Sequence, residues 1–130
     1  MSRTARSNAT EPDLKGATIL VIEDEPFIAM DIADGISEAG GKVVGPALSI
    51  AEALHLMSQN DIKAGILDAN LPDGSILPVI EKLTKQHAAM VIHTGAGLPS
   101  DIATAYPSIK VLTKPTSPQD LVAALLEAMS

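Results

Sequence analysis

The sequence contains no cysteine and no tryptophan, and Phe27 and Tyr106 are its only aromatic residues among 130. Without cysteine the chain can form neither disulfides nor thiolate zinc sites, and it has no thiol nucleophile. So few aromatic rings exclude a stacking platform for single-stranded nucleic acid. Basic residues are also scarce, because 9 Lys and Arg stand against 16 Asp and Glu, for a net charge of −7. This balance argues against binding to nucleic-acid phosphates.

Long hydrophobic runs are missing as well. No apolar run approaches the roughly 18 residues of a membrane span, and the two Arg of the opening MSRTARSNATEPD have no apolar segment behind them. We therefore expect a cytoplasmic protein without a secretion signal or membrane anchor. Residues 1–13 lack hydrophobic periodicity and are expected to form a mobile tail, while residues 14–130 have the size of one domain.

Short apolar runs alternate with amphipathic segments along residues 14–130. The runs cover 17–22, 43–44, 64–67, 90–92 and 109–112, and they are mostly continuous rather than alternating, which is typical of parallel strands buried on both faces. Helical patterns are expected over 27–39, from a Ser49–Glu52 capping box onward, and over 75–86, 100–106 and 117–129. Five βα units predict an α/β fold with a five-stranded parallel sheet and helices on both faces.

Polar residues of a few chemical types follow the predicted strands, and the carboxyl ends of parallel strands meet at one edge of a sheet. They are Glu23 and Asp24 after the first strand, Asp68 and Asn70 after the third, Thr94 after the fourth and Lys114 after the fifth. Closely packed carboxylates repel each other, and a hard cation such as Mg²⁺ with oxygen ligands relieves that repulsion. Asp68 would be the nucleophile that forms an aspartyl phosphate, Thr94 a hydrogen-bond donor and Lys114 a point charge. The pattern predicts a phosphoryl-transfer site.

The motifs ILVIEDE, ILDANLPDGS, HTG and TKP, in this order, resemble those of the receiver domain of two-component response regulators. The resemblance covers about residues 18–129 and implies a (βα)5 flavodoxin-like receiver fold with Asp68 as the phosphoacceptor. It implies Mg²⁺ ligands from Asp24 directly, Glu23 through water, Asp68, and Asn70 through its backbone carbonyl. Thr94 would bond the phosphoryl group and Lys114 would pair with it, next to a cis Lys114–Pro115 bond.

Receivers take their phosphoryl group from a histidine kinase or a histidine phosphotransfer protein and lose it by hydrolysis. The resemblance therefore implies a signalling phosphoacceptor and not a turnover enzyme. Because the sequence ends at Ser130, directly after the last predicted helix, we expect a stand-alone receiver. It would signal to an unknown downstream protein by changed binding, or serve as a phosphorelay intermediate or sink, and the sequence leaves both roles open.

The predicted site residues also bear on three alternative functions. A receiver-like adaptor that binds proteins without phosphorylation is the alternative, and the complete set of site residues counts against it. A phosphatase with an aspartyl nucleophile often carries a second Asp two residues later, where Asn70 stands. A nucleotide site needs a Gly-rich loop after the first strand, where the segment 23–26 reads EDEP.

The segment after Thr94 departs from most receivers. Val111 stands where most of them carry an aromatic switch residue, and Tyr106 is expected at the end of a helix instead. The stretch VIHTGAGLP resembles a subset of receivers with a Phe-Ala-Thr-Gly loop, although Ile and His replace Phe and Ala. Since glycines lower the cost of backbone rearrangement, we expect switching through the segment 95–107.

The last predicted helix and the histidines have both packing and functional interpretations. Leu121, Leu125 and Ala128 fit packing against the sheet, whereas Val122, Leu126 and Met129 extend a wide buried face or form a surface for a dimer or partner. His55, His87 and His93 are too scattered for a zinc site, so solvated or packing roles are expected, and His93 borders the predicted site.

Overall fold

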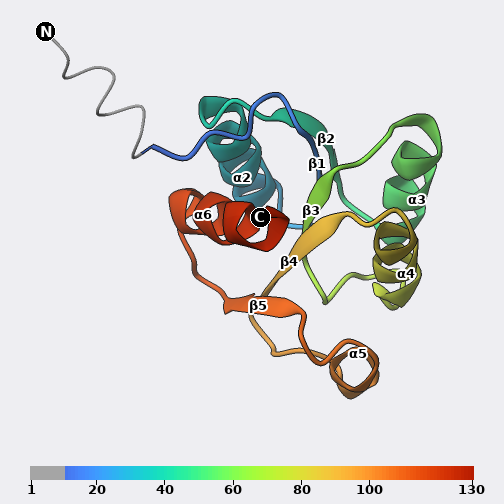
Figure 1. Cartoon of the computed structure of the whole chain (residues 1–130). Helices are drawn as coiled ribbons and strands as arrows, with labels where there is room; N and C mark the ends of the chain where they lie inside the picture. Colours follow the sequence, from blue (N-terminus) through green and yellow to red (C-terminus); the bar gives the residue numbers. More distant parts are fainter. Residues whose placement is uncertain (1–10) are drawn as a thin grey trace, which may run out of the picture.

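The computed structural model describes residues 11–130, so the first ten residues of the predicted tail lie outside the described part of the chain. The strands are β1 (Thr18–Ile22), β2 (Lys42–Ala47), β3 (Ala64–Leu67), β4 (Ala89–Thr94) and β5 (Lys110–Thr113). They form one parallel sheet in the order β2-β1-β3-β4-β5 (Figure 1). The predicted α/β fold with a five-stranded parallel sheet is confirmed.

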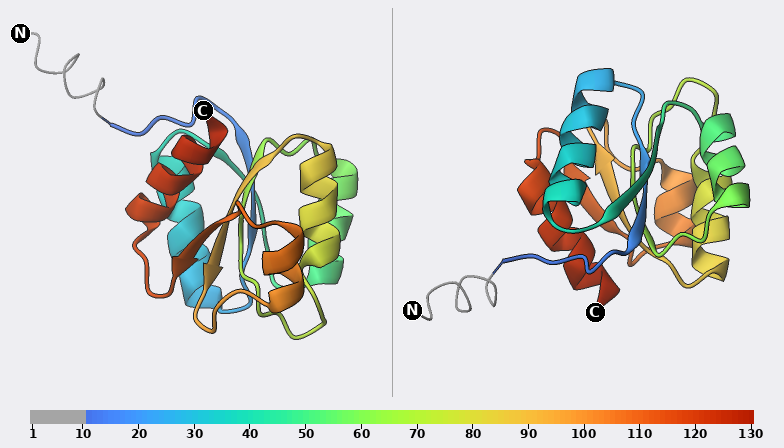
Figure 2. Two further views of the ribbon diagram at one scale, coloured as in Figure 1. Left: turned by 60° about the horizontal axis from the view of Figure 1, so that its bottom comes forward. Right: turned by 90° about the horizontal axis from the view of Figure 1, so that it is seen from above.

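Helices cover both faces of this sheet (Figures 1 and 2). They are α2 (Pro26–Glu38), α3 (Ile50–Gln59), α4 (Leu77–Lys85), α5 (Ser100–Ala105) and α6 (Pro118–Met129). One core cluster packs α2 and α6 against the sheet, with Ile19, Ile66 and Val91 at its centre. The other lies under α3, α4 and α5 and includes Leu20, Leu67 and Ile92. Neighbouring strand residues therefore belong to opposite cores, which explains why the apolar runs are continuous. No helix of the described part is long and apolar enough to cross a membrane.

Side-chain caps begin two of the helices as the sequence predicts. Ser49 Oγ accepts a hydrogen bond from the N–H of Glu52, 3.1 Å away, and Ser117 Oγ accepts one from Asp120 at the start of α6. The capping box differs from the expected form, because Glu52 accepts from the N–H of Leu48 and not from that of Ser49. Helix α4 begins two residues later than predicted, since Ser75 forms a turn that accepts a hydrogen bond from Leu77.

Strand β2 is longer than the two valines that predicted it, and it continues through Gly45 and Pro46 to Ala47. Proline is tolerated there because β2 lies at the edge of the sheet, where one side of the strand needs no N–H donor. Gly45 has a φ of +102°, and the pairing with β1 shifts its register in this region. The break that Gly and Pro signal is thus an irregularity within a strand and not its end.

The buried face of α6 differs from the expected one. Val122 is buried together with Leu121 and Leu125, whereas Ala128 is exposed, so the stripe is displaced toward α2. The two helices approach closely, since a Cβ on Gly35 of α2 would lie only 2.7 Å from the Cβ of Pro118. Leu126 and Met129 are partly buried against the same core. A wide buried face accounts for Val122, and a dimer through this helix stays a prediction.

Candidate functional site

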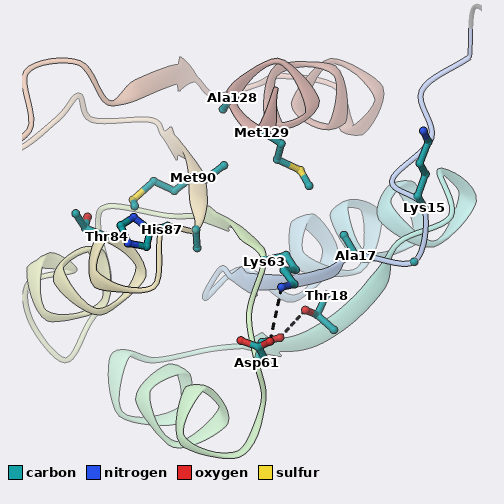
Figure 3. Close-up of a pocket in the computed structure, with 13 residues that line it drawn as sticks. Lys15, Ala17, Thr18, Asp61, Lys63, Thr84, His87, Met90, Ala128 and Met129 are labelled. Atoms are coloured by element: carbon teal, nitrogen blue, oxygen red, sulfur yellow. Dashed lines mark hydrogen bonds and ion pairs between the residues drawn. The ribbon is translucent and has the colours of Figure 1, made fainter.

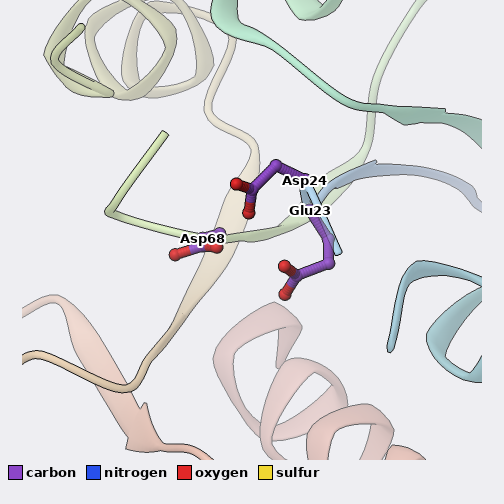
Figure 4. Close-up of side chains that lie close together, drawn as sticks. All are labelled: Glu23, Asp24 and Asp68. Carbon is purple, nitrogen blue, oxygen red and sulfur yellow. The ribbon is translucent and has the colours of Figure 1, made fainter. Parts of the chain in front are cut away.

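Three carboxylates meet at the carboxyl edge of the sheet, as predicted from the strand ends. Glu23 and Asp24 follow β1, Asp68 follows the neighbouring β3, and one oxygen of each lies within 4.8 Å of the others (Figure 4). Glu23 and Asp68 are buried, with 1% and 3% exposure, whereas Asp24 is exposed. Two carboxylates of the cluster are therefore shielded from solvent, and the third is open to it.

Lys114 provides the positive charge that faces this cluster. From the end of β5 its Nζ reaches across β4 to Asp68 Oδ2 after β3, 3.1 Å away, and beyond β3 to Glu23 Oε1 after β1, 2.9 Å away. Its stem passes Gly95, where an added Cβ would lie 3.8 Å from two of its carbons. The Lys114–Pro115 peptide bond is cis, as the resemblance implied.

Burial and pairing set the protonation of this cluster. Burial raises the pKa of the Glu23 carboxyl above its ordinary value, although the contact with Lys114 and a hydrogen bond from the N–H of Glu25 oppose the shift. Burial acts to lower the pKa of Lys114, but its contacts with Glu23 and Asp68 outweigh burial and raise it. Lys114 is therefore an ammonium at neutral pH, and its one charge pairs with two of the three clustered carboxylates.

The donor set fits Mg²⁺. All three clustered side chains offer carboxylate oxygens, which hard divalent cations prefer, and the described part of the chain places no sulfur or imidazole ligand within the cluster. An open hollow of about 510 Å³ beside Asp24 is also lined by Asn70, the predicted carbonyl ligand. The excess of carboxylate over ammonium and the open side at Asp24 are what a bound divalent cation requires.

Thr94 lies at the end of β4, buried at 1% exposure, and the structure brings it together with Asn70. The amide of Asn70 donates to Thr94 Oγ1 over 2.7 Å, and the hydroxyl donates to the carbonyl of Gly97 over 3.1 Å. The backbone N–H of Asn70 in turn donates to Asp68 Oδ1 over 2.9 Å. All six predicted residues therefore form one connected site, with the Thr94 hydroxyl bonded to the following loop.

The structure specifies the surroundings of two further residues at this edge. Asp73 accepts hydrogen bonds from the N–H groups of Ile50 and Ala51 at the start of α3, and these bonds lower the pKa of its carboxyl. They tie the loop after Asp68 to a helix 23 residues earlier, a contact for which the sequence carries no local signal.

His93 is the second such residue, and it is buried at 3% exposure without a hydrogen-bond partner for either ring nitrogen. Burial and the charge of Lys114 lower its pKa, so the ring is neutral at pH 7. The packing interpretation is confirmed for it, whereas His55 and His87 are exposed. The alternation of side chains along β4 indicates this burial, because His93 is on the same face of the strand as Val91, which lies in the core under α2 and α6.

The sheet's opposite edge carries a second hollow, of about 980 Å³ (Figure 3). Lys15, Thr18 and His87 line it, and Lys63 pairs there with Asp61 over 3.7 Å. Both partners of this ion pair are mostly exposed, so it contributes little to stability. None of the predicted site residues lines this hollow.

Comparisons with known proteins agree with this geometry. Residues 19–126 match the model of the response regulator receiver domain family. The chain is 32% identical over 130 residues to the acid tolerance regulatory protein ActR of Rhizobium meliloti, with 93% of this chain and 65% of ActR covered. It is 33% identical over 123 residues to the phyllosphere-induced regulator PhyR of Methylorubrum extorquens, covering 85% of this chain and 43% of PhyR. The chain thus spans less than two thirds of the length of these relatives.

Solved structures show the same relationship. A response regulator receiver domain protein from Clostridium thermocellum superimposes with a TM-score of 0.72 at 34% identity, covering 87% of this chain and 94% of that one. The response regulator PhyR from Brucella abortus gives a TM-score of 0.73 at 32% identity, covering 98% of this chain and 52% of that one. With the family model matched over most of its length, this chain belongs to the response regulator receiver domain family.

Proposed function

We propose that this receiver domain accepts a phosphoryl group on Asp68 in a Mg²⁺-dependent reaction. The observation that carries the proposal is the buried Asp68 carboxylate, which faces Lys114 over 3.1 Å and shares a carboxylate cluster with Glu23 and Asp24. In the transfer, an oxygen of Asp68 forms a bond to phosphorus while the bond between phosphorus and the donor's imidazole nitrogen breaks. The leaving imidazole keeps the electron pair of that bond. Asp68 becomes an acyl phosphate, so the chain is a signalling phosphoacceptor and not a turnover enzyme.

This chain's residues position and neutralise the reacting groups. Lys114 pairs with Asp68 before transfer and faces the phosphoryl oxygens afterwards, and Thr94 supplies a hydroxyl donor. Mg²⁺, when bound, would be held by Glu23, Asp24, Asp68 and the carbonyl of Asn70, and its charge would offset that of the phosphoryl group. Asn70 offers no carboxylate for acid–base turnover at its position, which agrees with a phosphoryl group that is held rather than released at once.

The donor is a histidine kinase or a histidine phosphotransfer protein in this proposal, and it docks beside the cluster. Phe27 and Met30 are three residues apart in the first turns of α2, so they share a face, and they are 79% and 60% exposed. They come three and six residues after Asp24, at the start of the helix that follows the carboxylate cluster. A partner that brings a phosphohistidine to Asp68 would cover this face.

Labelling tests the proposal directly. The protein is incubated with acetyl phosphate and Mg²⁺ and analysed by intact mass, and we expect one added phosphoryl group. Asp68→Asn should abolish the label, and Asp61→Asn, an exposed acid at the far edge of the sheet, should retain it. An unlabelled wild type would refute the proposal and favour the phosphorylation-independent adaptor. A label that persists in Asp68→Asn would refute Asp68 as the acceptor.

Phosphorylation then serves signalling in the cytoplasm, through changed binding to a downstream protein. In this proposal the segment 95–107, which resembles that of Phe-Ala-Thr-Gly receivers, is the switch. An aromatic switch on β5 is not available, because Val111 stands at that position and Tyr106 lies at the end of α5. Amide exchange of this segment should rise when a phosphoryl analogue is added, and equal protection in both states would contradict the switch. Return of the label to a histidine phosphotransfer protein would instead assign a phosphorelay role.

A further inference from the structure

The Thr94 hydroxyl makes three hydrogen bonds in the structure. Its oxygen lies 2.7 Å from Nδ2 of Asn70, 3.2 Å from the backbone nitrogen of Ala96 and 3.1 Å from the carbonyl oxygen of Gly97. The side chain is buried, so water does not compete freely for these positions. These three contacts determine what the hydroxyl can do next.

The direction of each bond follows from the partners. A carbonyl oxygen can only accept, so the single hydroxyl proton of Thr94 goes to Gly97, and the N–H of Ala96 can only donate. The Asn70 amide must then present its NH₂ group, because the hydroxyl has no second proton to give it. Both lone pairs and the proton are in use, so this hydroxyl has nothing left for a phosphoryl oxygen.

Asn70 also contacts the acceptor. Its backbone N–H donates to Asp68 Oδ1 over 2.9 Å, while its side chain donates to Thr94. One residue therefore connects the phosphoacceptor to the hydroxyl that would bind the phosphoryl group. Gly97, whose carbonyl accepts the Thr94 hydroxyl proton, has a φ of +86°, a conformation that favours glycine.

We propose that the Asn70 side chain is a positioning residue that holds the Thr94 hydroxyl on the Gly97 carbonyl while Asp68 is unphosphorylated. This inference rests on the proposed function and adds a role beyond the backbone carbonyl expected of Asn70. To bond a phosphoryl oxygen, the Thr94 hydroxyl must release Gly97 and turn away from the Asn70 amide. The loop after β4 then loses the contact that anchors it, so Asn70 sets the threshold for switching.

Truncating this side chain tests the inference cleanly, because Asn70→Ala keeps the backbone N–H and carbonyl. A neutral hydrogen bond contributes modestly, so we expect beryllofluoride, a phosphoryl analogue, to bind Asn70→Ala about two- to tenfold more tightly in Mg²⁺. Without the analogue, the amide resonances of Gly95, Ala96 and Gly97 should shift toward their positions in the bound wild type. The matched control is Asn60→Ala, which loses a 2.9 Å Nδ2 hydrogen bond to Leu56 at the end of α3 and should change neither measurement.

A double-mutant cycle with Thr94→Val shows whether Asn70 acts through the hydroxyl. In the valine background, Asn70→Ala should no longer change beryllofluoride affinity. An equal gain in both backgrounds, or none in either, overturns the positioning role while wild-type binding still supports the proposed function. A wild type that binds no beryllofluoride would overturn the proposed function, and the role of Asn70 with it.

Discussion

Replacing Lys114 with methionine would test whether one ammonium stabilises the acidic cluster. Methionine keeps the unbranched stem of the side chain up to Cε but leaves Glu23 and Asp68, at 1% and 3% exposure, without the ammonium. Contacts of 2.9 and 3.1 Å correspond to about 5–6 kcal/mol each in an effective dielectric of about 20, before desolvation is subtracted. Removing one partner of a fully buried pair costs about 3–5 kcal/mol. Because the Lys114 side chain is 21% exposed, we expect a loss of about 2–3 kcal/mol at pH 7 without Mg²⁺.

The pH dependence separates lost charge from lost packing. In the variant, the buried Glu23 carboxyl, whose pKa is already raised, loses the contact that opposed the shift. A raised folded-state pKa means that stability is retained below the unfolded pKa of about 4.5 and falls as pH rises through the folded value. In the wild type Lys114 stays charged throughout this range, because its pKa is raised, and it continues to oppose the upward shift of the Glu23 pKa. The deficit of the variant should therefore grow from pH 4.5 to pH 7.

Thermal and urea unfolding followed by circular dichroism measures this deficit. The matched control is Lys63→Met, which breaks a 3.7 Å ion pair between side chains that are 63% and 84% exposed and should cost about 0.5 kcal/mol or less. Without the ammonium the carboxylate cluster should bind Mg²⁺ more tightly, so the same Mg²⁺ concentration should stabilise the variant more than the wild type and narrow the gap between them. A Lys114→Met variant as stable as Lys63→Met, or a deficit equal at both pH values, would refute the electrostatic reasoning.

Three further predictions follow from the contacts. Mg²⁺ affinity should rise as pH increases through the raised pKa of Glu23, since binding requires the carboxylate. An affinity that calorimetry finds unchanged between pH 5 and 8 would contradict this. Asp73→Ala should lower the melting temperature near pH 7, and the difference should shrink below about pH 4, because a lowered folded pKa adds stability only above it. Gly45→Ala should cost about 2 kcal/mol or more in urea unfolding, because φ is +102° and the new Cβ would lie 2.6 Å from the backbone nitrogen of Ala47; an unchanged midpoint would show that β2 adapts.

The sequence was sufficient for the layout of the site because parallel strands turn order along the chain into proximity. Asp68 and Lys114 are 46 residues apart, yet each follows a strand, and strand ends share one edge. The continuous apolar runs identified those strands, and alternation placed residues on the two faces. Local pattern thus sufficed wherever the fold itself dictated the neighbours.

What the sequence did not predict depends on loops and tertiary contacts. The Asn70 amide bonds Thr94, and Asp73 in the same loop bonds the start of α3; these contacts span 24 and 23 residues, and no local pattern encodes them. The path of β2 through Pro46 depended on its edge position, which the order of elements alone does not specify. The displaced stripe on α6 reflects its packing on α2, a helix from the opposite end of the chain.

Charge balance connects the stability of this edge to its switching. Three carboxylates and one ammonium leave a formal charge of −2, which a divalent cation neutralises. Transfer to Asp68 replaces one carboxylate charge with a phosphoryl group of about −2, so the site becomes more negative by about one unit. The added charge increases the attraction for a hydrogen-bond donor. The buried Thr94 hydroxyl is such a donor, connected to Asp68 through the hydrogen bonds of Asn70, and its proton is donated to the Gly97 carbonyl. The strength of the Asn70 contact therefore decides how much added negative charge is needed before the loop is released.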